Sequence, residues 1–412
     1  MRKAVFTTAV ALGVAIASYA MMPPSARATT PNTCAMIARS FTFNSSMQIN
    51  AADPLHQMIQ SKIYAACLQT RGKQGASRMT TPQAGTSTTN AGTFVTFDVP
   101  GAFFTNPAAI NNSRAITGSY VDAGFITHSF LRTSDGTITP FDPPGAKCSS
   151  TEFFCSLANG ITPDGTIVGS YTGTDGFLGS HGYLRAPNGT FTVFDVPGSQ
   201  GSFANAINPA GAVTGGFFGS TVASHAFLRA PNGTFTTFDP LGSTSTGAGA
   251  INPAGMVTGN FIDVTGVSHG FLRTSDGTIT AFDPVGSTGT FVAGINPAGT
   301  IVGAFFTTDG FVHGFLRASN GTITVFDPPG SGLTVPSAIN PAGTIVGHFA
   351  NSSGVHGFLR ASNGTITVFD APGSIETSLV AINPGGTVTG RSLISFFPPA
   401  ALGFVVRPKN MH

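Results

Sequence analysis

One pattern recurs along most of the chain, and it constrains the fold more than any other feature. In the copy from His313 to Asp327, two short apolar runs flank a turn of small and polar residues that ends at Gly321. Two such runs around a turn containing Gly predict a β-hairpin. Close copies lie at His128–Asp142, His181–Asp195, His225–Asp239, His269–Asp283 and His356–Asp370. The chain is therefore a tandem repeat.

The repeats define a period that is typical of one fold class. Their first residues are Gly92, Gly136, Gly189, Gly233, Gly277, Gly321 and Gly364, which lie 44, 53, 44, 44, 44 and 43 residues apart. The Gly, Pro and Thr content excludes helical repeats, and each repeat contains four short segments typical of strands. Four strands in about 44 residues are typical of a β-propeller blade. We expect an all-β, seven-bladed β-propeller of four-stranded repeats.

The spacing of the segments also predicts how the ring closes. The hairpin connection has a constant length and belongs inside one blade, so the longer connection across Pro-Gly runs between blades. The outermost strand of each blade then comes from the start of the following repeat. Thr93–Asp98 is left over at the front, and we expect it to pair with Gly403–Arg407, which removes an open sheet edge. Asp98 would then lie opposite Leu402, which stands in the repeat position of the His.

The chain before the repeats divides into three parts. Residues 1–28 resemble a signal peptide, with Arg2 and Lys3 before an apolar run and a small-x-small cleavage pattern at the end. An uncleaved membrane anchor is the alternative. Residues 29–71 predict a small helical segment, and residues 72–91, rich in Gly, Ser, Thr and Gln, predict a linker. Residues 92–412 form the predicted propeller.

The composition argues against nucleic acid as a partner. Only 9% of the residues are charged, the formal net charge is +2, and the 19 basic residues are scattered. A nucleic-acid-binding protein needs clustered Lys and Arg. No segment after the signal peptide is long and apolar enough to cross a membrane as a helix. The predicted location is secreted or extracellular, with the periplasm as another compartment after export.

Four cysteines in an exported chain predict two disulfides. Their spacing groups Cys34 with Cys67, before the repeats, and Cys148 with Cys155, inside one repeat. A metal site is the rival interpretation, but no His stands at ligand spacing beside either pair in the sequence. We therefore predict disulfides, no metal site and no cofactor.

The recurring His and Asp are the first candidates for catalytic residues. An antiparallel hairpin places its first and last residues opposite each other, which predicts the pairs His128/Asp142, His181/Asp195, His225/Asp239, His269/Asp283, His313/Asp327 and His356/Asp370. An Asp that orients a His is half of a nucleophilic triad, but no nucleophile motif accompanies it. Six equivalent copies favour a structural role over catalysis or ligand contact. Repeated Phe residues are predicted to fill the space between blades, with an aromatic platform for sugars as the alternative.

The second repeat differs from the others in length. In an up-and-down blade, the two tight turns share one face and the two longer connections share the other. The longer connections carry all the length variation, and the largest insertion lies between Asp142 and Ile161. Because loops on a rigid scaffold often carry function, we hypothesise ligand binding at Glu152, Phe153 and Phe154. A loop that has drifted without a partner is the alternative.

The repeat motif resembles a known family. The recurring Ala-Ile-Asn-Pro-Ala-Gly-Thr-Ile-Val-Gly, followed by His-Gly-Phe-Leu or by the His-Ala-Phe-Leu of His225–Leu228, resembles the bacterial extracellular HAF repeat family. The resemblance covers residues 92–407 and implies secretion and a propeller-like fold. Repeat 1 departs at Asn112, and repeat 2 departs at Thr162 and Asp164.

Two functions remain open at this point. The first is a secreted binding or scaffold module, not an enzyme, that meets an extracellular or cell-envelope protein or glycan. The alternative is a propeller enzyme, a hydrolase or lyase that acts on an extracellular polymer at the central channel. A cluster of acid, base and nucleophile that differs between blades would favour the enzyme.

Overall fold

The structure is a computed structural model, and it describes residues 85–88, 92–124, 126–148, 154–173, 179–221, 223–396 and 399–408. The predicted signal peptide and the predicted helical segment lie outside these residues. The described part is all-β. It contains no helix that could cross a membrane.

The strands follow one another with short connections. They are β1 (Thr86–Thr88), β2 (Gly92–Phe97), β3 (Phe104–Ile110), β4 (Ile116–Val121), β5 (Thr127–Arg132), β6 (Ile138–Phe141), β7 (Ser156–Ile161), β8 (Ile167–Thr172), β9 (Ser180–Arg185), β10 (Phe191–Phe194), β11 (Gly201–Ile207), β12 (Val213–Phe218), β13 (Ser224–Arg229), β14 (Phe235–Phe238) and β15 (Ser243–Ile251). The later strands are β16 (Val257–Asp263), β17 (Ser268–Arg273), β18 (Ile279–Phe282), β19 (Gly289–Ile295), β20 (Ile301–Phe306), β21 (Val312–Arg317), β22 (Ile323–Phe326), β23 (Leu333–Ile339), β24 (Ile345–Asn351), β25 (Gly354–Arg360), β26 (Ile366–Phe369), β27 (Glu376–Ile382), β28 (Val388–Phe396) and β29 (Pro399–Pro408).

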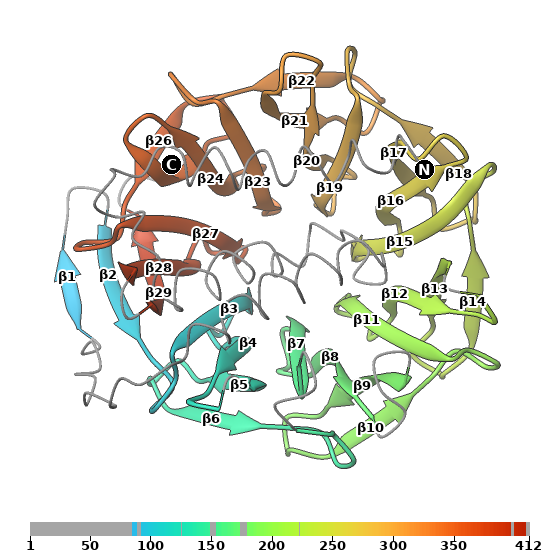
Figure 1. Ribbon diagram of the computed structural model, residues 1–412, viewed down its shortest axis with the longest axis horizontal. Coiled ribbons are helices and arrows are strands. Elements are labelled where there is room, and N and C mark those ends of the chain that lie inside the picture. The colour runs from blue at the N-terminus through green and yellow to red at the C-terminus, as the bar shows by residue number, and fades with distance from the viewer. Residues whose placement is uncertain are drawn as a thin grey trace, which may run out of the picture.

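These strands pair into four-stranded antiparallel units that stand around a ring (Figure 1). The units, from the inner to the outer strand, are β3-β4-β5-β6, β7-β8-β9-β10, β11-β12-β13-β14, β15-β16-β17-β18, β19-β20-β21-β22, β23-β24-β25-β26 and β27-β28-β29-β2. We call each unit a blade. The inner strands surround the centre of the ring, and the outer strands form its rim.

The hairpin turn shows why the sequence folds this way locally. In the hairpin of β21 and β22, the Gly321 N–H donates to Ala318 O at 2.9 Å and the Ala318 N–H donates to Thr322 O at 2.8 Å. Gly321 has a φ of 91°, a left-handed conformation that glycine adopts without steric cost. Asn320 Oδ1 accepts from the Thr322 N–H at 3.0 Å. The turn chemistry therefore fixes the register that places His313 near Asp327.

The core lies between the blades and depends on a recurring Gly opposite a recurring Phe. Gly303 on β20 pairs with Phe315 on β21, and a Cβ at Gly303 would stand 2.1 Å from Phe291 O and 2.8 Å from the Phe315 ring. The missing side chain lets the fully buried Phe315 lie across β20 and meet Phe282 of the preceding blade edge-on at 6.1 Å. The prediction that repeated Phe residues fill the space between blades is confirmed at these positions.

The ring closes through the N-terminal strand as predicted. β2 pairs with β29 along its whole length, from Gly92 opposite Pro408 to Phe97 opposite Gly403. β29 in turn reaches β3 of the first blade, with Ala401 beside Phe104. β1 adds outside β2, so strand pairing extends into the segment whose composition predicted a linker. Threonine and serine are tolerated in an edge strand with solvated side chains, and composition alone does not distinguish that strand from a linker.

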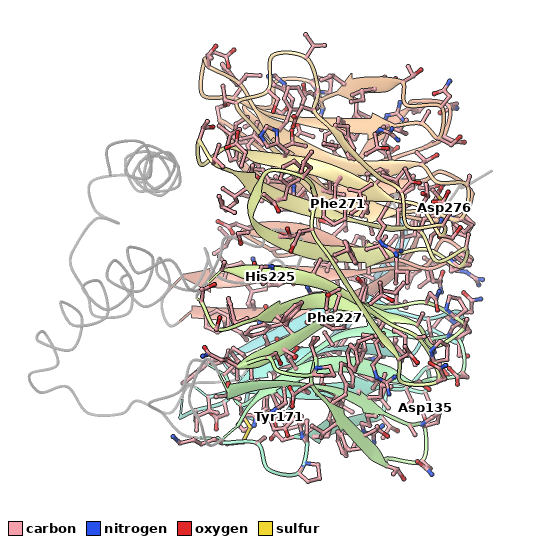
Figure 2. All side chains as sticks on the ribbon, turned by 90° about the vertical axis from the view of Figure 1, so that its right-hand side faces the viewer. Asp135, Tyr171, His225, Phe227, Phe271 and Asp276 are labelled. Carbon is pink, nitrogen blue, oxygen red and sulfur yellow. A yellow bond between two sulfur atoms is a disulfide. The ribbon has the colours of Figure 1, made fainter. Side chains whose placement is uncertain are left out.

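The two faces of the disc differ in chemistry. We call the face with the Asn-Pro-Ala-Gly turns and the hairpin turns the turn face, and the opposite face, where the inner strands begin, the His face. In the side view, Asp135 and Asp276 of the hairpin turns lie at one face, while His225 and Tyr171 lie toward the other (Figure 2).

Candidate functional site

The six predicted His–Asp pairs are all hydrogen-bonded on the His face. In each pair the Nδ1 atom of the His meets the Oδ2 atom of the Asp, at distances from 2.7 Å for His128–Asp142 to 3.0 Å for His356–Asp370. The imidazoles and carboxylates are partly exposed. Partly exposed pairs of this kind contribute roughly 0–1 kcal/mol each. They therefore set geometry more than stability.

The second oxygen of the Asp connects one blade to the next. Ser156 on β7 donates its hydroxyl to Asp142 Oδ1 at 2.6 Å, and Thr290 on β19 donates to Asp283 Oδ1. Asp98 has no His and accepts from Thr105 on β3. Burial raises the pKa of Asp98, and the Thr105 hydroxyl acts in the opposite direction. These contacts support the structural role that the repetition predicted.

A second system of contacts joins the blades on the turn face. At five junctions between blades, a buried Asn in the turn after the inner strand donates its side-chain N–H to the backbone carbonyl of the equivalent residue in the next blade. These links join Asn208 to Asn252, Asn252 to Asn296, Asn296 to Asn340, Asn383 to Asn111 and Asn111 to Thr162, at 2.9–3.5 Å. Sequence reasoning missed this role, although Asn recurs at this position in every repeat except the second and was a visible signal.

The repeated Arg also connects neighbouring blades. Its guanidinium lies 4.8–5.0 Å from the ring centre of the Phe at the outer edge of the preceding blade. The pairs are Arg132–Phe97, Arg185–Phe141, Arg229–Phe194, Arg273–Phe238, Arg317–Phe282 and Arg360–Phe326. A cation over an aromatic face is attracted by the ring quadrupole, so these contacts support the ring.

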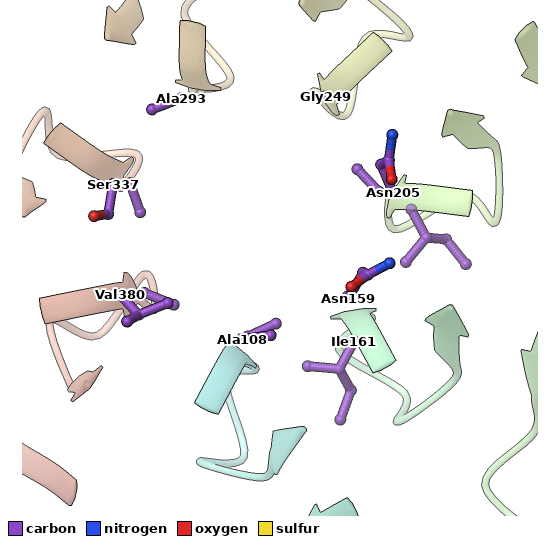
Figure 3. Close-up of a pocket in the computed structure, with 14 residues that line it drawn as sticks. Ala108, Asn159, Ile161, Asn205, Gly249, Ala293, Ser337 and Val380 are labelled. Carbon is purple, nitrogen blue, oxygen red and sulfur yellow. The ribbon is translucent and has the colours of Figure 1, made fainter. Parts of the chain in front are cut away.

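The centre of the ring holds a cavity of about 230 Å³ (Figure 3). All seven inner strands line it, mostly with small or apolar residues, and Asn159, Asn205 and Ser337 are the polar residues among them. The two asparagines donate to carbonyls of the next inner strand at 2.9 Å. Ser337 is buried, and its hydroxyl has no hydrogen-bond partner among the described residues. The cavity walls alone offer little chemistry.

One position in the second strand of each blade differs between blades, and in one sector of the ring it holds a titratable or charged side chain. This position directly follows the recurring Gly of the second strand. In five blades it holds Ser119, Ser170, Gly216, Asn260 and Ala304. In the last two blades it holds His348 on β24 and Arg391 on β28. His348 pairs across the sheet with Val335, and Arg391 pairs with Ser378. Two residues further along these inner strands, Ser337 and Val380 line the cavity.

The electrostatics of this sector are unusual for so uncharged a chain. Burial, and then the charge of Arg391, lowers the pKa of His348 to about 4. Burial raises the pKa of Glu376 on β27, while Arg391 opposes that shift. Burial lowers the pKa of Arg391, and Glu376 opposes it. Arg391 Nη1 reaches Asn106 Oδ1 of the first blade at 3.5 Å, and His348 Nδ1 is buried without a partner among the described residues. We call His348, Glu376 and Arg391 the channel cluster.

The channel cluster can perform acid–base chemistry. A His that stays neutral above about pH 4 can accept a proton. A carboxyl with a raised pKa can donate one, and Arg391 can hold an anion. Perturbed groups of this kind gather at functional sites. Sequence reasoning missed the cluster because each residue stands alone in its repeat, although their departure from the repeat consensus was a usable signal.

The insertion of the second repeat carries the remaining predicted site residues. Cys148 and Cys155 form the predicted disulfide, with 4.5 Å between their Cα atoms. The other predicted pair, Cys34 and Cys67, lies outside the described residues. So do Glu152 and Phe153. Phe154 is described and is only 5% exposed, so its side chain packs inward, and ligand contact at this loop stays a prediction.

The fold also overturns the reason for dismissing a metal at these cysteines. The ligand atoms of His128, Asp142, Cys148 and Cys155 all lie within 4.8 Å of one another. His128 stands 20 positions before Cys148 in the sequence, so short-range spacing could not reveal it. The hairpin of β5 and β6 brings it back beside the insertion.

Comparison with known proteins gives a likeness in fold. No family model matches the chain, and no curated protein matches it. A solved puromycin hydrolase is 14% identical with a TM-score of 0.49, over 72% of this chain and 52% of that one. TolB from Acinetobacter baumannii is 12% identical with a TM-score of 0.41, over 69% and 76%. A gluconolactonase from Xanthomonas campestris is 10% identical with a TM-score of 0.39, over 77% and 90%.

These matches correct one prediction. The expectation that the chain is not an enzyme is overturned, because the matched structures include a puromycin hydrolase, a gluconolactonase and prolyl endopeptidases. This chain spans about half the length of the puromycin hydrolase. At 10–14% identity the likeness concerns the propeller-like fold and assigns no reaction to this chain.

Proposed function

We propose that the protein is a secreted, seven-bladed propeller enzyme of the HAF repeat type, a hydrolase or lyase that acts on an extracellular polymer at its central channel. The blade count takes each four-stranded unit as one blade. The observation that carries the proposal is the channel cluster, because it brings an acid, a base and a cation together in one sector of the ring.

Each residue of the cluster has a role in this proposal. Arg391 binds an anionic group of the polymer, such as a carboxylate. His348 accepts the proton that leaves the attacked carbon or the attacking water. Glu376 gives its proton to the oxygen of the leaving group, so the proton gained at His348 balances the one released at Glu376.

The proposal is tested on the full chain with a panel of anionic polysaccharides, neutral polysaccharides and peptides, by counting new chain ends. We expect cleavage of an anionic polymer. His348→Gln and Glu376→Gln should each reduce kcat at least about 100-fold, in keeping with the usual contribution of a general acid or base. Arg391→Lys should mainly raise KM.

Ala304→Ser is the matched control, because Ser occupies the same ring position in the first two blades. It should leave activity unchanged. If no polymer is cleaved, or if all three cluster variants keep full activity, the proposed function is wrong.

A further inference from the structure

A second site lies on the His face, where the first blade meets the second. His128, Asp142, Cys148 and Cys155 each offer one ligand atom, and these four atoms lie within 4.8 Å of one another. Both cysteines lie in the insertion that follows Asp142, and no Cys lies in or after the hairpins of the other five His–Asp pairs. The second repeat therefore adds two sulfur atoms to one of six otherwise equivalent pairs.

The fold holds three of the four side chains from rigid elements. His128 lies on β5, and Asp142 directly follows β6. Cys155 is fully buried, its N–H donates to Thr127 O at 2.9 Å, and its carbonyl accepts from the Thr172 N–H at 3.1 Å. Cys148 is exposed in the insertion. The cluster is thus largely preorganised, and one ligand approaches from a loop.

Further polar groups orient the ligands. His128 Nε2 lies 3.5 Å from Asp122 Oδ2, which leaves Nδ1 directed at the cluster. Asp142 Oδ1 accepts from Ser156 at 2.6 Å, and Ser156 Oγ is 2.7 Å from Ser129 Oγ. Ligating His and carboxylate groups in metal sites are supported by hydrogen bonds of this kind.

We propose that reduction of the Cys148–Cys155 disulfide converts this cluster into a zinc site. A dithiol reductant supplies two electrons, the S–S bond breaks, and the reductant becomes a disulfide. Zn²⁺ then displaces one proton from each thiol, and these two protons are released. The Nδ1 proton of His128 moves to Nε2, which lies beside Asp122 Oδ2, so the imidazole binds through Nδ1 as a neutral ligand. Two thiolates, one imidazole and one carboxylate form a tetrahedral set of the type that Zn²⁺ prefers.

The site works as a redox switch in this scheme. The oxidised cysteines have no thiolate to offer, so the disulfide form lacks two of the four ligands. The reduced form gains them without a change of fold, because the insertion is already anchored at Cys155. This inference is independent of the channel cluster, and either can fail alone.

The test uses the full chain with Cys34→Ser and Cys67→Ser, so that Cys148 and Cys155 are the remaining thiols. Zn²⁺ affinity is measured by competition with a chromophoric chelator, before and after treatment with a dithiol. We expect one equivalent of Zn²⁺ to bind, and we expect reduction to raise its affinity at least about 100-fold. Loss of a group that only supports a metal ligand costs about 10–100-fold in affinity, and oxidation removes two of the ligands themselves. Co²⁺ substitution should give a thiolate charge-transfer band.

His128→Gln and Cys148→Ser should each abolish the gain on reduction. His269→Gln is the matched control, because His269 makes the same contacts, to Asp283 at 2.7 Å and Asp263 at 3.4 Å, without cysteines nearby. It should leave the Zn²⁺ affinity unchanged. Equal affinity in the oxidised and reduced forms, or binding that survives His128→Gln, would overturn the proposal.

Discussion

Asn383 donates its side-chain N–H to the backbone carbonyl of Asn111 at 2.9 Å, although the two residues are 272 positions apart. This bond joins the last blade to the first on the turn face. On the same blade, the backbone pairing of β2 with β29 completes the four-stranded sheet. The ring is therefore closed twice, once by a strand and once by a buried side chain.

The side-chain closure can be tested at Asn383. Asn383→Ala removes the bond to Asn111 O and the 2.8 Å bond that Asn383 Oδ1 accepts from the Thr387 N–H. Both partner groups are buried and lose their hydrogen bond, and each unsatisfied group costs roughly 1–3 kcal/mol, so we expect the free energy of unfolding to fall by about 2–6 kcal/mol. Denaturant unfolding measures the change. Asn188→Ala, in an exposed hairpin turn, should cost less than about 1 kcal/mol; equal losses in the two variants would contradict this account.

The strand closure can be tested by shortening the chain. A protein that begins at Gly101 lacks β2, so β29 becomes an open edge. We expect aggregation or loss of a single cooperative unfolding transition, measured by light scattering and calorimetry. A protein that begins at Gly92 keeps β2, loses β1 alone among the described strands and is expected to remain monomeric. If the shorter protein were equally stable and monomeric, β2 would not be the closing strand.

The recurring Gly opposite the recurring Phe makes a steric prediction. Gly303→Ala places a methyl group 2.1 Å from a backbone oxygen and 2.8 Å from the Phe315 ring, so the two strands must separate. We expect a loss of about 1–3 kcal/mol, the usual cost of overpacking. Gly249→Ala is the control, since a Cβ there meets no atom within 4 Å, and thermal unfolding should show little change for it.

The channel cluster predicts a pH dependence of stability. The pKa of His348 is lowered to about 4 in the folded state, against an unfolded value near 6.5. The unfolded chain therefore binds more protons between these values, and stability falls as pH drops from about 6.5 to 4, by at most about 3 kcal/mol. Glu376 acts in the opposite direction, since its raised pKa favours the folded state when the carboxyl is protonated.

Two variants separate these contributions. Between pH 7 and pH 4.5, the free energy of unfolding of His348→Gln should fall less than that of the wild type, and that of Glu376→Gln should fall more. Parallel curves for the three proteins would show that neither group titrates differently in the folded state. Arg391 is common to all three proteins.

The sequence by itself determined the parts of the structure that repeat. The alternation of apolar residues and the Gly of each turn predicted the hairpins. The number of residues from His to Gly is constant, and turn geometry sets the antiparallel register, so each His could be placed beside its Asp. The same reasoning assigned β2 to the last blade. It left the Thr-rich edge strand β1 as a linker, because edge strands lack a buried face whose pattern could be read.

Only the tertiary structure decided which residues of different blades meet. Asn383 reaches Asn111, Arg391 lies near His348 and Glu376, and His128 faces Cys155, because ring closure sets the angle between neighbouring blades. No local period encodes that angle. Residues that depart singly from the repeat, such as Arg391, become a site only when the ring brings them together.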